Sequence, residues 1–196
     1  LVLTNAVYFK GAWVEEFTEH VTKDAPFWVT PEESASVPTM YQYHEHDYFE
    51  NEAMQALQMP FYGGYALTIL LPRTRDGLAD LEAQLPEHLA ACLAGLEKRS
   101  VKVYIPRFEF DTGYQLKETL KAMGAVSMFD PGTADLSGML TPGTDVFISH
   151  VLQKAYIKVD EKGAEAAAAS AAVAALEAAA GPAEEPPTFR ADHPFA

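Results

Sequence analysis

The sequence has little cysteine, little positive charge and no long hydrophobic run. It holds one cysteine, Cys92, among 196 residues, which excludes an internal disulfide framework and a metal site built from several thiolates. Lys and Arg number 14 against 28 Asp and Glu, a formal net charge of −14, which argues against nucleic acid and anionic membrane surfaces as partners. No apolar run approaches the ~20 residues of a transmembrane helix. We therefore expect a protein that binds neither nucleic acid nor membrane.

The composition that remains favours a folded domain. Hydrophobic residues make up 48% of the chain and charged residues 21%, which excludes a disordered or fibrous protein. The length is enough for one sizeable core. The chain opens without Met inside an apolar strand pattern, residues 1–9, and stops at residues 193–196, where another apolar run begins. We expect it to be a piece of a longer protein.

Hydrophobic periodicity predicts a mixture of strands and helices, which is an α+β fold. Alternating apolar residues predict strands at residues 1–10, 25–29, 36–43, 53–60, 65–71, 101–110 and 146–159. Apolar residues at helical spacing predict a helix through residues 78–93 and a shorter one at 114–123, stopped by Gly124. The strand at 146–159 is unusually long for a small domain.

The composition changes abruptly at residue 164. Residues 164–180 contain 12 alanines among 17 residues, and Gly181-Pro182 follows. Propensity alone favours a helix here, because Ala is the best helix former and Gly-Pro is a good stop. The segment lacks an apolar stripe with side chains large enough to anchor it on a core. Small side chains throughout are typical of a segment that has to fit several environments.

Several different short motifs follow one another along the whole chain. They include TNAVYFKGAW at residues 4–13, VPTM at 37–40, MPF at 59–61, LLP at 70–72, IPRF at 105–108, ADLSGM at 134–139, KAYIKVDEKGAEAAAAS at 154–170 and FRADHPF at 189–195. In this order they resemble the serpins, the serine protease inhibitor family. The resemblance implies one serpin domain over residues 1–196, incomplete at both ends, with mixed sheets, packed helices and an exposed reactive-centre loop at residues 162–188. It also implies that the chain is the C-terminal portion of that fold.

The resemblance implies a protease inhibitor and not an enzyme. An inhibitory serpin is a suicide substrate: a serine-type protease, or a cysteine-type one, cuts the loop and is trapped as a covalent acyl-enzyme. The cut loop then inserts as a new strand between strands 1–10 and 146–161, an irreversible conformational change related to β-augmentation. About 14 inserted residues at ~0.5–1.5 kcal/mol each release on the order of 10 kcal/mol. The alternatives are a non-inhibitory serpin, acting as a carrier, storage or chaperone-like protein, and a structural module with an Ala-rich arm.

The hinge of the loop meets the requirement for insertion. In a strand, successive side chains point to opposite faces. If residues 164–177 form a strand, Glu165 and Glu177 lie on the same face, so the face that contains Ala164 can be buried without an unpaired charge. The usual threonine of the family after Gly163 is Ala164 here. The resemblance assigns the hinge to Glu161, Gly163, Ala164, Glu165, Ala166, Ala167, Ala168 and Ala169.

The position of the reactive bond depends on the direction of counting. The family's loop length counted forward from Gly163 places it at Glu177–Ala178, whereas counting back from Pro194 points nearer Ala183. We favour the forward count, because the sheet fixes the length that can insert. Glu177 suits a glutamate-specific protease, Leu176 a chymotrypsin- or subtilisin-like one, and alanines such as Ala180 an elastase-like one. We expect the target protease as partner, no cofactor, a monomer when intact, and an extracellular or secreted location with a cytoplasmic one as the alternative.

The resemblance also assigns four residues to the control of sheet opening: Asn5, Trp13, Arg107 and Gln153. Asn5 and Gln153 should lie near each other where the two flanking strands part. Many serpins have a histidine in place of Gln153, so a pH response from that position is not expected. Arg107 should pair with Glu161 at the top of the loop. For Trp13, simple core packing and a switching role are equally favoured.

Three other residue groups could indicate different chemistry. His44 and His46 could place two imidazoles on one strand face as metal ligands, but a solvated strand edge is the favoured interpretation and we expect no metal. Cys92 lies in an apolar helical run, which favours a core thiol over a nucleophile. Ser137 lacks the Gly-x-Ser-x-Gly context of hydrolases. An enzyme therefore has almost no support.

Overall fold

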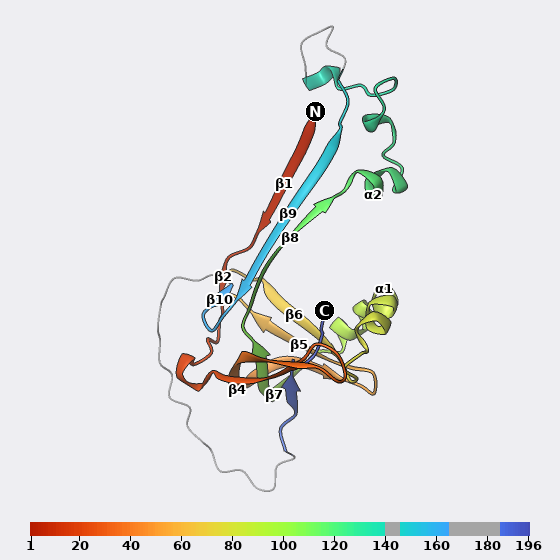
Figure 1. The fold of residues 1–196 in the computed structure, drawn as a ribbon. Coiled ribbons are helices and arrows are strands. Elements are labelled where there is room, and N and C mark those ends of the chain that lie inside the picture. The colour runs from red at the N-terminus through yellow and green to blue at the C-terminus, as the bar shows by residue number, and fades with distance from the viewer. Residues whose placement is uncertain (140–145, 165–184) are drawn as a thin grey trace. The chain divides into compact units, whose positions relative to one another are not determined.

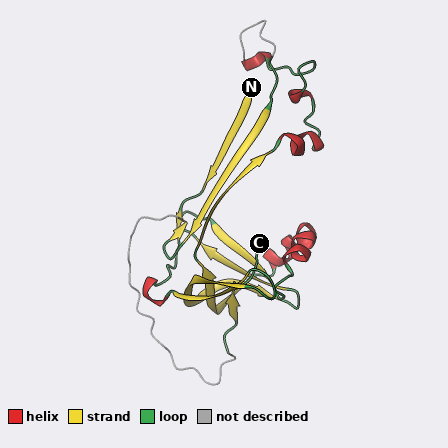
Figure 2. Ribbon diagram, viewed as in Figure 1, coloured by secondary structure: helices red, strands yellow, loops and turns green. Residues whose placement is uncertain are grey.

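The computed structural model describes residues 1–139, 146–164 and 185–196. Strands dominate it, and short helices accompany them (Figures 1 and 2). This confirms the α+β prediction. The contacts divide the chain into two compact units: Leu1–Phe9 with Glu109–Ile157, and Lys10–Phe108 with Lys158–Ala196.

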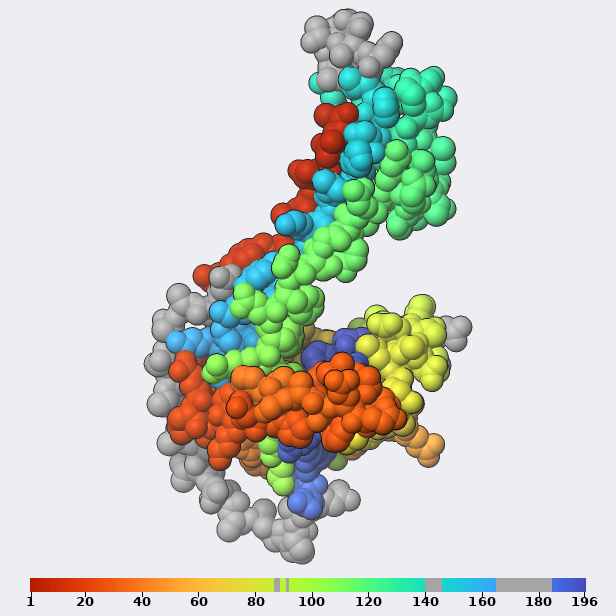
Figure 3. Space-filling model, viewed as in Figure 1, coloured from red at the N-terminus to blue at the C-terminus, as the bar shows by residue number. Residues whose placement is uncertain are grey.

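The first unit is a three-stranded sheet with the strand order β1-β9-β8. Its strands are β1 (Val2–Tyr8), β8 (Phe108–Gln115) and β9 (His150–Val159). β1 runs parallel to β9, in a register that pairs Val2 with His150 and Tyr8 with Tyr156, and the two lie side by side in Figure 3. Helix α2 (Lys117–Ala122) and the short turns η2 (Ser127–Phe129) and η3 (Ser137–Met139) follow β8.

The second unit contains a six-stranded sheet in which β11-β7-β4-β5-β6 are neighbours in that order and β3 pairs with β4. Its strands are β3 (Lys23–Trp28), β4 (Ser34–Glu50), β5 (Met54–Pro60), β6 (Ala66–Pro72), β7 (Glu97–Pro106) and β11 (Thr188–Arg190). The short strands β2 (Gly11–Ala12) and β10 (Gly163–Ala164) form a two-stranded sheet. The turn η1 (Glu19–Val21) and helix α1 (Leu78–Ala94) complete the unit.

The core of the second unit is built on β4, β5, β6 and β7, and β5 and β6 are buried on both faces. β4 and β7 pair antiparallel from Thr39↔Pro106 to Tyr48↔Glu97, and alternate residues on one side are buried, as expected for a half-covered sheet. The largest buried side chains include Trp13, Tyr48, Phe189, Met40, Leu57, Met59, Ile69, Leu71 and Ile105. α1 brings Cys92 into a further cluster with Met54, Ala56 and Leu70.

Four predicted boundaries were wrong, each because pairing overrides local pattern. The strand predicted at 36–43 continues to Glu50 because its second half pairs with both β5 and β7. The strand predicted at 101–110 is two strands that separate at Arg107. The helix predicted at 114–123 begins at Lys117 because the preceding residues belong to β8. The strand predicted at 146–159 begins at His150, where its partner β1 begins.

Among the residues of the described ranges, no helix is long and apolar enough to cross a membrane. Of the Ala-rich segment, only Ala164 is described, and it lies in β10. The rest of the helix that propensity favours at 164–180 falls outside the described residues.

Candidate functional site at the base of the loop

A tight antiparallel pair of short strands lies where the sequence predicts the start of the loop. β10 pairs with β2 so that Gly163 faces Ala12 and Ala164 faces Gly11. Gly163 has a φ of 137°, a value that side chains rarely allow. A Cβ atom there would collide with the Gly11 carbonyl oxygen and lie 2.8 Å from Ala12 Cα. Ala164 is 2% exposed, so its small side chain is buried at this junction. The sequence therefore needs glycine and then a small residue at this point.

Glu161 forms a partly buried ion pair with Arg107, two residues before Gly163. Its carboxylate is 3% exposed and accepts hydrogen bonds from Arg107 Nε at 2.7 and 2.8 Å, from Arg107 Nη2 and from the Thr22 hydroxyl. Burial raises the pKa of Glu161, but the donors on Arg107 and Thr22 outweigh burial and hold the pKa below its usual 4.5. The structure thus brings together the two residues expected to pair and adds Thr22, which the motifs did not indicate as a partner.

Trp13 joins the core to the segment that precedes the loop. It is 1% exposed and stacks on Phe61 with ring centroids 4.1 Å apart. Its indole Nε1 donates to the Asp160 carbonyl at 2.9 Å, and its backbone N–H donates to the Lys162 carbonyl at 3.0 Å. Trp13 is therefore a packed core residue that also holds the chain on both sides of Glu161.

Asn5 and Gln153 occupy opposing positions of β1 and β9, where they are register partners in the parallel pair. Asn5 is exposed and Gln153 is partly buried. The reactive-bond candidates lie outside the described residues; they are Leu176, Glu177, Ala178, Ala180 and Ala183. The same holds for the hinge residues Glu165, Ala166, Ala167, Ala168 and Ala169.

Residues 187–190, which follow the predicted loop, are bound to the second unit by backbone and side-chain contacts. Lys102 N–H donates to the Pro187 carbonyl at 2.9 Å, and β11 pairs parallel with β7. Gln55 Nε2 donates to the Thr188 carbonyl at 2.9 Å, and the Arg190 guanidinium lies 3.7 Å from the centre of the Tyr104 ring. Sequence reasoning missed Gln55, because it is 133 residues from Thr188 and belongs to no motif with a polar role.

The two histidines considered as metal ligands, His44 and His46, have different environments. His44 is exposed and lies 3.4 Å from Glu15, whereas His46 is 1% exposed. The solvated edge predicted for the pair is therefore wrong for His46. Burial, with smaller contributions from His44 and Lys98, lowers the pKa of His46 to about 4. The part of the chain that the structure describes holds no group of three His, Cys, Asp or Glu suited to a metal ion.

Cys92 and Ser137 show no environment that would activate them. The Cys92 thiol is buried, as predicted, and burial raises its pKa, which weakens it as a nucleophile. The Ser137 hydroxyl donates to Asp135 Oδ1 at 2.6 Å on the surface.

Comparison with known proteins identifies the family. A family profile described as Serpin (serine protease inhibitor) matches residues 1–196. Leukocyte elastase inhibitor A of Rattus norvegicus is 40% identical over 205 residues, covering all of this chain and 53% of the relative.

Among solved structures, Serpin48 of the insect Tenebrio molitor has a TM-score of 0.85 at 34% identity, with 99% of this chain and 50% of that chain covered. Human thyroxine-binding globulin has a TM-score of 0.84 at 27% identity, with 99% and 50% covered. The chain spans about half the length of the curated relatives it matches. The serpin fold, the paired strands and the family match agree: the chain belongs to the serpin family.

Proposed function

We propose that this chain is the C-terminal portion of an irreversible inhibitor of serine-type endopeptidases, in which residues 162–188 are the reactive-centre loop. The assignment to the C-terminal portion rests on the order of the motifs, since the loop-like segment and the motif at 189–195 come last. The relatives named as elastase inhibitor and antithrombin support a protease as partner.

One observation carries the proposal: β1 and β9 are direct parallel neighbours. β10, which contains the hinge residues Gly163 and Ala164, follows β9 after only three residues. A loop that enters beside β9 would run between these two strands and form hydrogen bonds with both. Separating β1 from β9 breaks one ladder, and a new strand between them forms two. The net gain of backbone hydrogen bonds, with ~0.5–1.5 kcal/mol for each, favours insertion once cleavage frees the loop.

The chemistry of the hinge supports this path. Gly163 provides the backbone conformation that turns the chain, and Ala164 is already buried. Most of the residues at 165–175 are alanines, whose side chains are too small to obstruct entry into a sheet. None of these residues is a proline, which would lack the backbone N–H that a strand ladder needs. Trapping a protease requires insertion faster than hydrolysis of the acyl-enzyme, and small side chains favour fast insertion.

A non-inhibitory carrier is the second candidate. Thyroxine-binding globulin, named for a ligand, is a close structural relative. The second unit contains a cavity of about 550 Å³ beside α1, lined by apolar side chains such as Met54, Leu81, Leu85 and Leu89 and by polar ones such as Asn51, Arg73 and Asp80. This volume lies in the range of sites for small organic ligands.

Incubation of the full-length protein with subtilisin, pancreatic elastase and a glutamate-specific endopeptidase separates the candidates. We expect a covalent complex that survives boiling in denaturant with at least one protease. Mass spectrometry of the released C-terminal peptide then identifies the bond among Glu177–Ala178 and its neighbours. Cleavage of the loop by all three enzymes without any complex would overturn the proposal and favour the carrier.

A further inference from the structure

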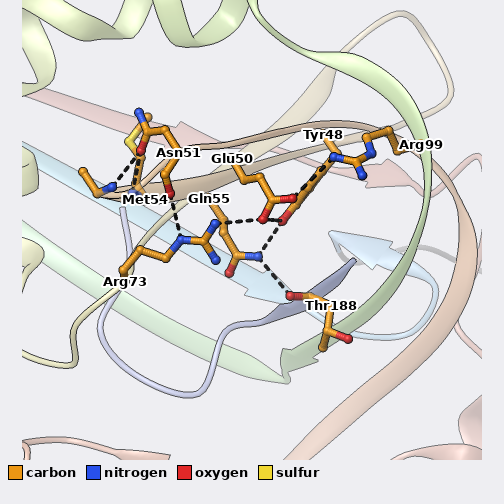
Figure 4. A network of polar contacts seen from close by, with 9 residues as sticks. Tyr48, Glu50, Asn51, Met54, Gln55, Arg73, Arg99 and Thr188 are labelled. Atoms are coloured by element: carbon orange, nitrogen blue, oxygen red, sulfur yellow. Dashed lines mark hydrogen bonds and ion pairs between the residues drawn. The ribbon is translucent and has the colours of Figure 1, made fainter. Parts of the chain in front are cut away.

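A connected set of polar side chains lies beneath the segment that leaves the loop (Figure 4). Gln55 Nε2 donates to the Tyr48 hydroxyl oxygen at 2.6 Å and to the Thr188 carbonyl at 2.9 Å. The Tyr48 hydroxyl donates to Glu50 Oε2 at 3.0 Å. Arg73 Nη2 donates to the same oxygen at 2.8 Å. We call Tyr48, Glu50, Gln55 and Arg73 the Gln55 network.

The donors and acceptors of the Gln55 network fit together in one direction only. Glu50 is acceptor-only when ionised, and its hydrogen bond with Arg73, assisted by Tyr48 and opposed by burial, holds its pKa below the usual 4.5. The Tyr48 hydroxyl must therefore point its proton at Glu50. Its oxygen is left to accept from Gln55, and burial raises the pKa of Tyr48 to about 12, so the hydroxyl keeps its proton.

This direction fixes the orientation of the Gln55 amide. Its nitrogen faces two acceptors, Tyr48 and Thr188, and an amide turned by 180° would place its oxygen against both of them. Tyr48 is 1% exposed and Gln55 is 8% exposed, so water does not replace these contacts easily and an unmatched pair here is costly. Both amide protons are used, one inside the core and one on the departing segment.

Beyond Thr188 the departing segment is held by the fully buried Phe189 and by backbone hydrogen bonds from Ala191 to Tyr104 and from Trp28 to Asp192, so Gln55 adds a side-chain contact where these attachments begin. β11 has three residues and one neighbouring strand, β7. The Glu185 carboxylate lies 3.5 Å from Lys102 Nζ but is almost fully exposed, and such a pair contributes little. An open cavity of about 390 Å³, lined by Arg73, Arg99 and Glu185 among others, lies beside this segment. Gln55 is thus a buried side-chain anchor at the start of β11.

We propose that Gln55 is a positioning residue that holds the outgoing end of the loop on the second unit, and that Tyr48, Glu50 and Arg73 act through it by fixing its amide. The inference rests on the proposed function only in treating residues 162–188 as a reactive loop. Gly163 and Gln55 then mark the two ends of that loop. Gly163 has a backbone conformation that other residues rarely adopt, and the Gln55 amide can satisfy its partners in one orientation only.

Hydrogen–deuterium exchange on the full-length uncleaved protein tests the anchor directly. The variant Gln55→Met keeps the length of the side chain and removes both donors. We expect exchange of the peptide covering residues 185–192 to become about tenfold faster, as loss of one buried hydrogen bond allows. Peptides covering β5 and β6 should be unchanged. The matched control is Gln58→Met on the same strand, because Gln58 donates to Thr68 and not to β11.

A second variant separates orientation from contact. Tyr48→Phe leaves the Gln55 amide in place but removes the group that orients it, and we expect a smaller acceleration, about threefold, over the same peptide. If Gln55→Met and Gln58→Met leave exchange at 185–192 equally unchanged, or if all peptides accelerate together in Gln55→Met, the anchor does not exist.

The rate of covalent complex formation provides a separate functional measurement. With whichever protease forms a complex with the wild-type protein, we expect Gln55→Met to slow complex formation about threefold. A loop whose outgoing end is held less firmly presents its cleavage site to the protease less often. If no protease forms a complex, the proposed inhibitory function fails while the exchange experiment still decides the role of Gln55. An unchanged rate together with faster exchange would overturn the positioning role in inhibition.

Discussion

The Glu161 carboxylate is only 3% exposed and pairs with the half-exposed Arg107. A change of charge at Glu161 should therefore destabilise the protein. In Glu161→Lys two cations would lie side by side where an ion pair now holds the chain before the hinge. We expect a loss of about 3 kcal/mol in the free energy of unfolding, with polymers or prematurely inserted protein on native gels. The control Glu118→Lys makes the same charge change on the surface and should stay within about 0.5 kcal/mol of wild type. Unchanged monomer content in Glu161→Lys would contradict this.

His46 should make stability depend on pH. Neither of its ring nitrogens has a hydrogen-bond partner among the described residues, and its pKa is about 4 in the folded state against 6.5 when unfolded. Between these two values the unfolded chain binds the proton and the folded chain does not, so stability falls as the pH is lowered from 6.5 toward 4. The loss is about 2 kcal/mol at pH 5 relative to pH 7.

Urea unfolding at pH 7 and pH 5 measures this difference. In His46→Phe the difference should shrink by about 2 kcal/mol, whereas His44→Gln, which removes only one of the smaller contributions to the lowered pKa of His46, should reduce it far less. Equal pH dependence in wild type and His46→Phe would refute the assignment.

At the scale of elements, the β2–β10 pair depends on glycine. Gly163→Ala introduces a Cβ that collides with Gly11 and forces an unfavourable backbone conformation at a φ of 137°. We expect the pair to separate and the protein to lose about 1–3 kcal/mol of stability. Thermal unfolding and exchange at residues 11–13 measure the effect. Gly138→Ala is the control because a Cβ there meets nothing within 4 Å, and a melting temperature equally unaffected in both variants would rule the explanation out.

How far the sequence predicts these elements depends on the range of the contacts that fix them. Most strands and the helix through residues 78–93 followed from periodicity, because their signals are local. The contact between Arg107 and Glu161 followed from the resemblance to the serpin family. The true length of β4 and the start of β9 did not, since pairing with distant partners sets them. The burial of His46 and the role of Gln55 depend on which strands stack and pair across the sheet, and nothing in their immediate sequence indicates it.

At the scale of the whole molecule, the parallel pairing of β1 and β9 can be locked. Asn5 and Gln153 are register partners, and neighbouring strands lie close enough for a disulfide between these positions. We expect the oxidised double variant Asn5→Cys/Gln153→Cys to be cut in the loop without forming a covalent complex, because the strands cannot part.

Reduction should restore complex formation in the double variant, and each single variant should form complex at the same rate in both redox states. Cys92 is buried and should not compete for the bond. A complex formed at the wild-type rate by the oxidised protein would mean that insertion does not occur between these strands.

The register of β1 has a consequence for synthesis. Val2 pairs with His150, so the partner of the first strand is translated 148 residues later (150 − 2). At roughly 5–20 residues per second, β1 waits on the order of 10–30 s for β9. During that interval the edge of β1 that later pairs with β9 is available to any other chain leaving a ribosome nearby, and the yield of folded protein should therefore depend on how fast the residues up to β9 follow.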